Sequence, residues 1–293
     1  MRKKSFILII VAVILACLMV SCERDPQYEE GEYVYENHTL NYINGFRIQW
    51  GSDDLSYDIR KTVMEIVKSM VLVKGGTYAM GSNSSFSFPD EKPIHWVSLS
   101  DFFLAKVTIT QKQWASIMGE NPLWNQEYGK GDNYPANFIS YEEAMQFVDK
   151  LNKYSGLEFR MPTEAEWEYA ACGGIYSQGY LYSGSNNVNE VAWCKSNSNG
   201  KMHLIATLSP NELGLNNMSG NVWEWCSDWY GNYTGDSANN PTGPSSGVKR
   251  VVRGGSFTYD ANYCRCKVRN SLPETNRSLA VGLRLATSAN ESE

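Results

Sequence analysis

Residues 214–225 read GLNNMSGNVWEW, and this stretch carries the strongest signals in the chain. Carbonyl groups of alternate residues in a strand point the same way, so Gly220 and Val222 would offer two backbone oxygens along one edge. The side chains of Asn217 and Glu224 would complete an all-oxygen set, which suits calcium better than magnesium. We therefore predict a calcium site formed by Asn217, Gly220, Val222 and Glu224.

The same stretch also fits a glycine turn that leads into a buried strand. In that interpretation Trp223 and Trp225 share the face opposite the Glu224 side chain and belong to the core. Spacing alone leaves the calcium site and the core strand equally open.

Six further blocks surround this stretch in a fixed order. They read GGTYAMGS (75–82), DEKPIHWVSLSDFFLAKVTITQKQW (90–114), RMPTEAEWEYAACGG (160–174), NPTGPSSG (240–247), RVVRGGSF (250–257) and VGLRLA (281–286). In this order the blocks resemble the formylglycine-generating enzyme family, also called the sulfatase-modifying-factor domain, over roughly residues 70–287. The resemblance implies an α+β fold related to C-type lectins, with short strands, few helices and much irregular structure. Function has to be argued from the site itself.

The resemblance also locates a candidate active site. Family members that oxidise a sulfatase cysteine to formylglycine use two cysteines, which bind copper(I) and activate oxygen. Aligned on the GGS of residues 254–256, those two positions fall on Tyr259 and Cys264. A lone thiolate does not form the two-sulfur site that copper(I) favours, so neither copper(I) nor the oxidase activity is expected. Ser256 and Trp223 match residues that line the family's active site, and with Cys264 they are the candidate catalytic residues.

Cys266 leaves an alternative open. In a strand, Cys264 and Cys266 would project to the same face, where two thiolates would suit copper(I). A bridge to another cysteine or simple burial explains Cys266 equally well. The cysteines past residue 22 are Cys172, Cys194, Cys226, Cys264 and Cys266. Their number is odd, so at least one of them stays unpaired within the chain if the others form disulfides.

The first residues have the features of a bacterial lipoprotein signal peptide. A basic start is followed by an apolar run over residues 6–20, shorter than the ~20 residues that a spanning helix needs. Ser21 and Cys22 come next, so we predict cleavage before Cys22 and its acylation. Cys17 is a weaker candidate, because cleavage there leaves apolar residues exposed, and an uncleaved anchor is the remaining alternative. The expected location is the cell envelope, with lipid anchoring in the outer membrane.

The charge balance limits the range of partners. The formal net charge is −6, and cleavage after residue 21 removes three positive charges and no negative ones, which leaves −9. An acidic surface disfavours polyanions, so no nucleic-acid partner is expected. We expect a membrane contact through the lipid anchor and a protein or peptide partner, with a glycan as an alternative.

The domain organisation follows from these signals. We predict a signal peptide at 1–21, a linker and extension at 22–69, the family domain at 70–287 and a tail at 288–293. Residues 23–56 lack sustained periodicity, whereas an apolar stripe from Asp58 to Met70 predicts a helix that packs on the main domain.

Three helix starts are marked by capping boxes, in which a hydroxyl and a Glu or Gln three residues later satisfy free backbone amides. The pairs are Thr110 with Gln113, Ser140 with Glu143, and Thr163 with Glu166. The second helix should stop at Gly156.

The last of these helices begins with three carboxylates that resemble a catalytic cluster. Glu164, Glu166 and Glu168 nevertheless stand where a helix dipole attracts acidic residues, and we interpret them as structural. His95 is also interpreted as a hydrogen-bonded structural residue. A group of aromatic residues either stacks on sugars or peptides or belongs to the core: Tyr180, Tyr182, Trp229, Tyr230 and Tyr233.

Together these observations favour an envelope lipoprotein with a calcium-stabilised binding or scaffold module. One alternative is an oxidase that converts a peptide cysteine to formylglycine through Cys264, with Cys266 or an exogenous thiol as the second sulfur. Another is a glycan-binding, lectin-like module.

Overall fold

The structure is a computed structural model that describes residues 31–35 and 38–289. The predicted signal peptide and the lipidation of Cys22 lie outside the described residues. Within the described part of the chain, no helix combines the length and the hydrophobicity that crossing a membrane requires.

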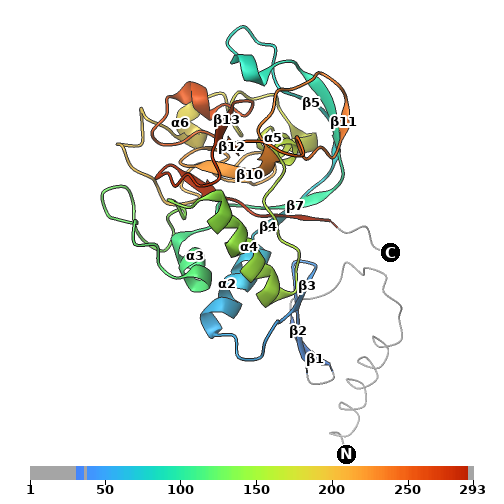
Figure 1. Cartoon of the computed structure of the whole chain (residues 1–293), viewed down its shortest axis with the longest axis vertical. Coiled ribbons are helices and arrows are strands. Elements are labelled where there is room, and N and C mark those ends of the chain that lie inside the picture. Colours follow the sequence, from blue (N-terminus) through green and yellow to red (C-terminus); the bar gives the residue numbers. More distant parts are fainter. Residues whose placement is uncertain (1–30, 36–37, 290–293) are drawn as a thin grey trace, which may run out of the picture.

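Three helices gather on one side of the molecule, and most strands lie on the other (Figure 1). The three are α2 (Tyr57–Lys68), α3 (Gln111–Met118) and α4 (Tyr141–Ser155). The strand-rich side contains the short helices α5 (Glu164–Ala171) and α6 (Val188–Val191). Single 3-10 turns cover Pro89–Glu91, Gly174–Tyr176 and Ala261–Cys264.

The sheet that positions the candidate site has the strand order β13-β12-β10-β14. Its members are β10 (Trp223–Trp229), β12 (Arg250–Arg253), β13 (Arg269–Leu272) and β14 (Val281–Leu283). Strand β10 runs antiparallel to β12 and parallel to β14, so the tryptophan-rich segment lies in the interior of the sheet.

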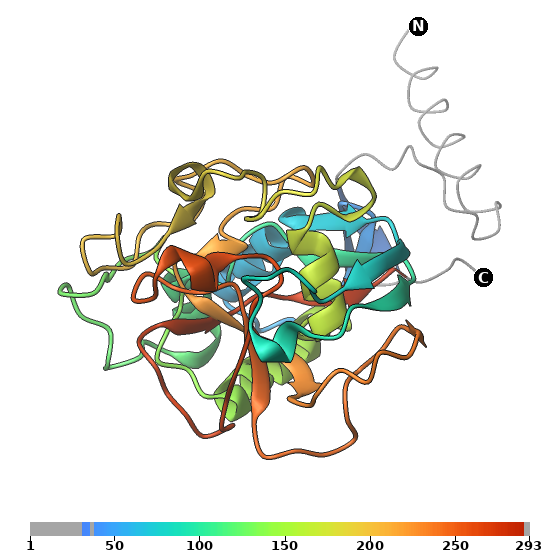
Figure 2. The same cartoon turned by 90° about the horizontal axis from the view of Figure 1, so that it is seen from above.

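Smaller sheets and long connections complete the domain. One has the order β11-β6-β5, with β5 at Gly76–Met80, β6 at His95–Leu99 and β11 at Ala238–Asn239. A second has the order β15-β7-β4, with β4 at Met70–Val73, β7 at Phe102–Ala105 and β15 at Ala286–Ser288. Strands β8 (Ala192–Trp193) and β9 (Ser219–Gly220) form a pair. Irregular segments run around these strands, as the view from above shows (Figure 2).

An antiparallel three-stranded sheet, which the sequence analysis did not predict, precedes α2. It consists of β1 (Gly31–Tyr35), β2 (His38–Ile43) and β3 (Phe46–Gln49). Asn44 and Gly45 join β2 to β3 with φ angles of 51° and 79°, the left-handed conformation of a tight hairpin turn. The Asn-Gly pair between apolar residues was the signal in the sequence.

The three predicted capping boxes are confirmed. The hydroxyls of Thr110, Ser140 and Thr163 each accept a hydrogen bond from the backbone N–H three residues on. In each case the Gln or Glu side chain at that position accepts a hydrogen bond from the backbone N–H of the capping residue. Helix α4 stops at Gly156, which has φ 66°, as predicted. The helix expected after Asp58 is also present as α2.

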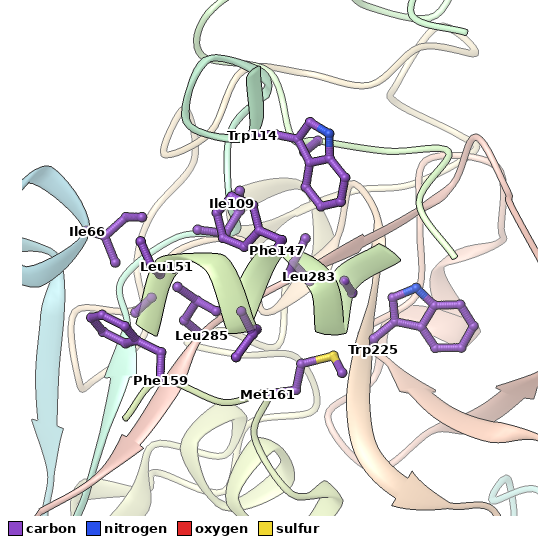
Figure 3. Packing of buried hydrophobic residues seen from close by; sticks show 14 of the residues in the cluster. Ile66, Ile109, Trp114, Phe147, Leu151, Phe159, Met161, Trp225, Leu283 and Leu285 are labelled. Atoms are coloured by element: carbon purple, nitrogen blue, oxygen red, sulfur yellow. The ribbon is translucent and has the colours of Figure 1, made fainter. Parts of the chain in front are cut away.

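The largest apolar core lies between the helices and the sheets (Figure 3). Trp114 of α3 and Phe147 of α4 stack with ring centroids 5.2 Å apart, and Leu283 of β14 and Trp225 of β10 belong to the same cluster. Ile66 of α2 is fully buried in it as well. Burial of each such side chain contributes about 1.5–3 kcal/mol. Helix α2 therefore shares one core with the main domain, and the domain boundary predicted between residues 69 and 70 runs through that core.

Candidate functional site

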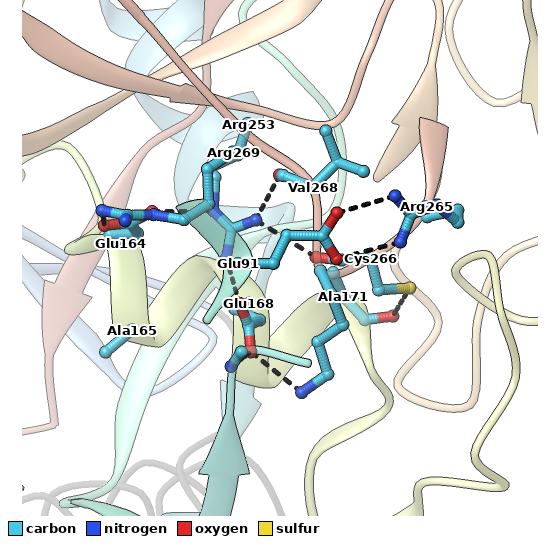
Figure 4. Close-up of polar contacts among 12 residues, drawn as sticks. Glu91, Glu164, Ala165, Glu168, Ala171, Arg253, Arg265, Cys266, Val268 and Arg269 are labelled. Carbon is cyan, nitrogen blue, oxygen red and sulfur yellow. Dashed lines mark hydrogen bonds and ion pairs between the residues drawn. The ribbon is translucent and has the colours of Figure 1, made fainter. Parts of the chain in front are cut away.

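The carboxylates at the start of α5 form buried ion pairs (Figure 4). Glu164 accepts two hydrogen bonds from Arg269, at 2.6 and 2.7 Å. Glu168 is fully buried and pairs with Arg253 and with Lys267, whose Nζ lies 2.8 Å from Oε1. These contacts attach α5 to β12, to β13 and to the segment before β13. The structural interpretation of this acidic cluster is confirmed, with arginine partners in addition to the helix dipole.

Glu166 completes the set on the outer side of the helix. Its carboxylate accepts from Arg160 at 2.6 and 2.7 Å and from the backbone N–H of Thr163 at 2.9 Å. All three carboxylates therefore have cationic partners.

A small cavity of about 200 Å³ lies beside strand β10, at the position where the family resemblance places the active site. Trp223 and Tyr259 both line it, and their rings pack edge to face on each other, with centroids 5.4 Å apart. The remaining lining is mixed apolar and polar: Thr258, Asn270, Leu272, Ser278, Leu279, Ala280 and Val281. Tyr259, at which the resemblance places the first family cysteine position, is thus part of the cavity wall.

The indole N–H of Trp223 is buried without a hydrogen-bond partner, although the other buried indoles of this region have one. Trp225 donates to the carbonyl of Ile139 at 3.1 Å, and Trp167 donates to the Glu224 carboxylate at 2.7 Å. Leaving a buried donor unsatisfied costs about 1–3 kcal/mol. The Trp223 N–H is therefore a hydrogen-bond donor that no group of the described chain satisfies.

Cys264 and Ser256 do not line this cavity. Cys264 is fully buried in a separate cluster with Cys194 and Tyr182, and burial raises the pKa of its thiol well above the ordinary value. The Ser256 hydroxyl lies 3.0 Å from that of Thr258. Of the three candidate catalytic residues, only Trp223 lines this cavity.

The structure does not support the alternative in which Cys264 and Cys266 share one face of a strand. Cys264 closes a 3-10 turn, and the two thiols belong to different clusters, one with Cys194 and the other around α5. The described cysteines are all free thiols. Residues 31–35 and 38–289 also contain no cluster of three or more His, Cys, Asp or Glu side chains suited to a metal ion.

The backbone of the predicted calcium site differs from the expected strand. Strand β9 ends at Gly220, and Gly220 and Asn221 have φ angles of 74° and 65°, so Gly220 and Val222 are not alternate residues of one regular strand. Asn217 is likewise left-handed, and its Oδ1 accepts a hydrogen bond from the N–H of Ala206 at 2.8 Å.

Glu224 has three donors around its carboxylate. Arg284 donates to both oxygens, at 2.7 and 2.9 Å, and the Trp167 indole supplies the third bond. Both Glu224 and Arg284 are buried, so a guanidinium stands where a cation would sit. In this arrangement the Glu224 carboxylate does not fit a calcium ligand unless Arg284 moves away. Arg284 lies in the VGLRLA block, which the sequence analysis used only for the resemblance. The calcium site stays a prediction.

Most of the aromatic candidates for ligand stacking have partners within the protein. Arg250 lies over Trp229 at 3.6 Å, and the Tyr230 hydroxyl donates to Asp90 at 2.7 Å. Tyr233 packs on His95 at 4.5 Å, which agrees with the structural interpretation of that histidine. Tyr182 is buried, which leaves Tyr180 as the exposed member.

Comparison with known proteins agrees with this fold. The family model described as the sulfatase-modifying factor enzyme 1-like domain matches residues 57–289. The chaperone protein LppX of Paenibacillus barcinonensis is 30% identical over 243 residues, which cover 66% of this chain and 80% of that protein. A formylglycine-generating enzyme of Thermomonospora curvata is 28% identical over 278 residues, which cover 71% and 89%.

Solved structures show the same architecture. Treponema denticola variable protein 1 is similar with a TM-score of 0.67 and 27% identity, over 89% of this chain and 100% of that one. PvdO from Pseudomonas aeruginosa has a TM-score of 0.65 and 24% identity, over 75% and 94%. The expected α+β fold, related to C-type lectins, with short strands and few helices is confirmed. Because the family model spans most of its length, the chain belongs to the sulfatase-modifying factor enzyme 1-like family.

Proposed function

We propose that the protein is an envelope lipoprotein whose domain binds an extended polypeptide through the Trp223–Tyr259 cavity, without copper-dependent oxidation. The observation that carries this proposal is that Trp223 lines that cavity and that its buried indole N–H has no hydrogen-bond partner. A backbone carbonyl of a bound peptide is an acceptor of the kind that this donor lacks.

The size and lining of the cavity favour one anchoring side chain. A volume of about 200 Å³ is below the ~300–1,000 Å³ typical of pockets that enclose a whole small ligand. The edge of the Tyr259 ring and the side chains of Leu272 and Val281 form an apolar wall, while Asn270 supplies polar groups beside it. An apolar residue inserted here, with its carbonyl on Trp223, gives both contact area and direction.

Two features argue against oxidation at this cavity. Tyr259 has no sulfur to share with a copper ion, and the raised pKa of the buried Cys264 thiol disfavours the thiolate that a soft metal binds. A relative named as a chaperone supports a role that acts on polypeptides, whereas other relatives are named as formylglycine-generating enzymes. The proposal follows the similarity to the protein named as a chaperone.

Lipid anchoring through Cys22 is the second part of the proposal, and it rests on the signal-peptide pattern of the sequence. Anchoring would hold the binding cavity near the membrane surface. Cys22→Ala should abolish acyl labelling, and unchanged labelling would exclude this part.

The binding proposal is tested with a permanently unfolded polypeptide, reduced and carboxymethylated α-lactalbumin, as the probe. We expect saturable binding to the wild-type chain, and Trp223→Phe should weaken it roughly tenfold, because one hydrogen bond to a buried donor is lost. The matched control is Trp193→Phe, which removes an indole that donates to Thr207 at 3.0 Å and lies outside the cavity lining. No binding by the wild type, or equal affinity in Trp223→Phe, would exclude the proposal.

A further inference from the structure

A second and larger cavity, of about 610 Å³, shares no lining residue with the first. Tyr78 and Tyr169 form part of its wall, and Cys172 lies at its edge. Its volume falls within the ~300–1,000 Å³ of typical small-molecule sites. The proposed peptide-binding function makes no use of this cavity.

One thiol, that of Cys172, lies at the wall of this cavity, and a second, that of Cys266, is buried nearby. Cys172 caps the C-terminus of α5 and is half-buried, whereas Cys266 is only 1% exposed. Cys266 Sγ lies 3.4 Å from the carbonyl oxygen of Ala171, the residue before Cys172 (Figure 4). Cys172 also packs against the apolar cluster to which Cys266 belongs. A ligand in the cavity thus reaches Cys172 directly, and Cys266 only through Cys172.

We propose that Cys172 and Cys266 form a redox-active dithiol that exchanges with an anionic low-molecular-weight disulfide bound in this cavity. Cys172 is the attacking thiol, and Cys266 is the resolving thiol behind it.

The electrostatics of the pair match this division. The hydrogen bond from Cys266, and then the charge of Lys267, hold the pKa of the Cys172 thiol below its ordinary value although burial opposes them. The same hydrogen bond and burial raise the pKa of Cys266 well above its ordinary value. The accessible thiol is therefore the better source of thiolate, which is the nucleophile in disulfide exchange.

The charges of the cavity favour an anionic ligand. Its lining includes the cationic side chains of Arg265 and Lys267 and no carboxylate. Glu91 binds Arg265 through two hydrogen bonds, at 2.7 and 2.9 Å, so Arg265 is already paired. The Lys267 ammonium donates to Glu168 and to the carbonyl of Ala79, both at 2.8 Å, and lies 5.3 Å from the centre of the Tyr78 ring. An ammonium has three N–H donors, so one more hydrogen bond, to a ligand carboxylate, completes its set.

The exchange proceeds in two balanced steps. The Cys172 thiolate attacks one sulfur of the disulfide RSSR, the S–S bond breaks, and one RS⁻ leaves and takes up a proton. Cys266, once deprotonated, then attacks Cys172 Sγ in the mixed disulfide, so that the Cys172–Cys266 bond forms and the second RS⁻ leaves. Overall the two protein thiols are oxidised by two electrons, and RSSR is reduced to two RSH.

The test uses the reduced full chain, with glutathione disulfide as the anionic probe and cystamine as a cationic one. We expect the wild type to release two glutathione equivalents per chain and to form a Cys172–Cys266 disulfide, detected by peptide mass spectrometry. Cys266→Ser should stop at one glutathionyl adduct on Cys172, and Cys172→Ser should give no adduct. Cystamine should react roughly tenfold more slowly, because the Lys267 charge repels it.

Cys226→Ser is the matched control, since Cys226 is fully buried and outside the cavity lining. It should exchange like the wild type. Folding of each variant is checked by its melting curve, and the alkylation rate of wild-type Cys172 against pH gives a readout that needs no variant. Absence of the adduct in folded Cys266→Ser would overturn the proposal. So would a wild-type disulfide that excess reduced glutathione cannot open, because that behaviour marks a structural cross-link. Faster reaction with cystamine would overturn the anionic assignment.

Discussion

The two cavities differ in whether a cysteine thiol lies at the wall. At the smaller cavity, the resemblance places the two family cysteine positions at Tyr259, which lines the cavity, and at Cys264, which is buried away from the lining. At the larger cavity, Cys172 lies at the wall with Cys266 behind it. Sequence resemblance leads to the first cavity, where the thiol chemistry is missing, whereas only the folded structure brings together the thiols of the second.

Each region also has its own buried ion pair. A glutamate–arginine pair, Glu224 with Arg284, is buried behind the Trp223 cavity, and Glu168 holds Lys267 beside the thiol pair. Helix α5 and strand β10 join the two regions, because Trp167 of the helix donates to Glu224 of the strand. Substitutions in β10 test how much its buried carboxylates contribute to stability.

The largest effect is expected from Glu224→Gln. Arg284 is fully buried and would lose its only ion-pair partner of the described chain, which typically costs 3–5 kcal/mol, or roughly 10 °C in melting temperature. The measurement is thermal unfolding in calcium and in chelator. The ion pair with Arg284, taken alone, predicts the same loss in both solutions.

Asp132→Asn is the control for this substitution. It removes an exposed pair with Lys112, 3.5 Å apart, and should change the unfolding free energy by less than about 1 kcal/mol. A Glu224→Gln effect seen only in the presence of calcium would show that Glu224 binds the ion. The predicted site with Asn217, Gly220 and Val222 would then stand.

A somewhat smaller effect, visible only as a pH dependence, is expected at Asp228 of β10. Burial, followed by the charge of Glu164, raises the pKa of Asp228 to about 7. The folded state therefore holds this proton more tightly than the unfolded state. The resulting stabilisation is present below the ordinary pKa of about 4 and is lost as the pH rises through about 7.

Asp228→Asn removes this titration and keeps an acceptor for the N–H of Glu164, which now lies 2.9 Å from Asp228 Oδ2. The wild type should lose up to about 4 kcal/mol relative to the variant between pH 4 and pH 8. Urea unfolding at several pH values measures the difference. A difference in unfolding free energy between the two proteins that does not change with pH would contradict the raised pKa of Asp228.

Local signals in the sequence identified much of the fold. A capping box requires residues only three positions apart, so the starts of the helices at Thr110, Ser140 and Thr163 followed from the sequence. The hairpin at Asn44 and Gly45 had an equally local signal, which the sequence analysis overlooked because the surrounding residues lack periodicity. The family blocks supplied the rest of the architecture.

The candidate site was less accessible, because its contacts join distant segments. No residue near Glu224 in the sequence indicates that its carboxylate pairs with Arg284, sixty positions later. The left-handed residues Gly220 and Asn221 also break the strand on which the calcium geometry depended. The separation of Cys264 from Cys266 arises in the same way, since a 3-10 turn replaces the assumed strand.

The most direct test of the central claim, that the Trp223–Tyr259 cavity binds rather than oxidises, is a peptide oxidation assay. The purified chain is loaded anaerobically with copper(I), mixed with a cysteine-containing sulfatase peptide and exposed to oxygen, and aldehyde formation is followed by mass spectrometry. Because Tyr259 replaces one sulfur and the Cys264 thiol is buried with a raised pKa, we expect no aldehyde. Robust turnover by the wild type that disappears in Cys264→Ser would contradict the claim.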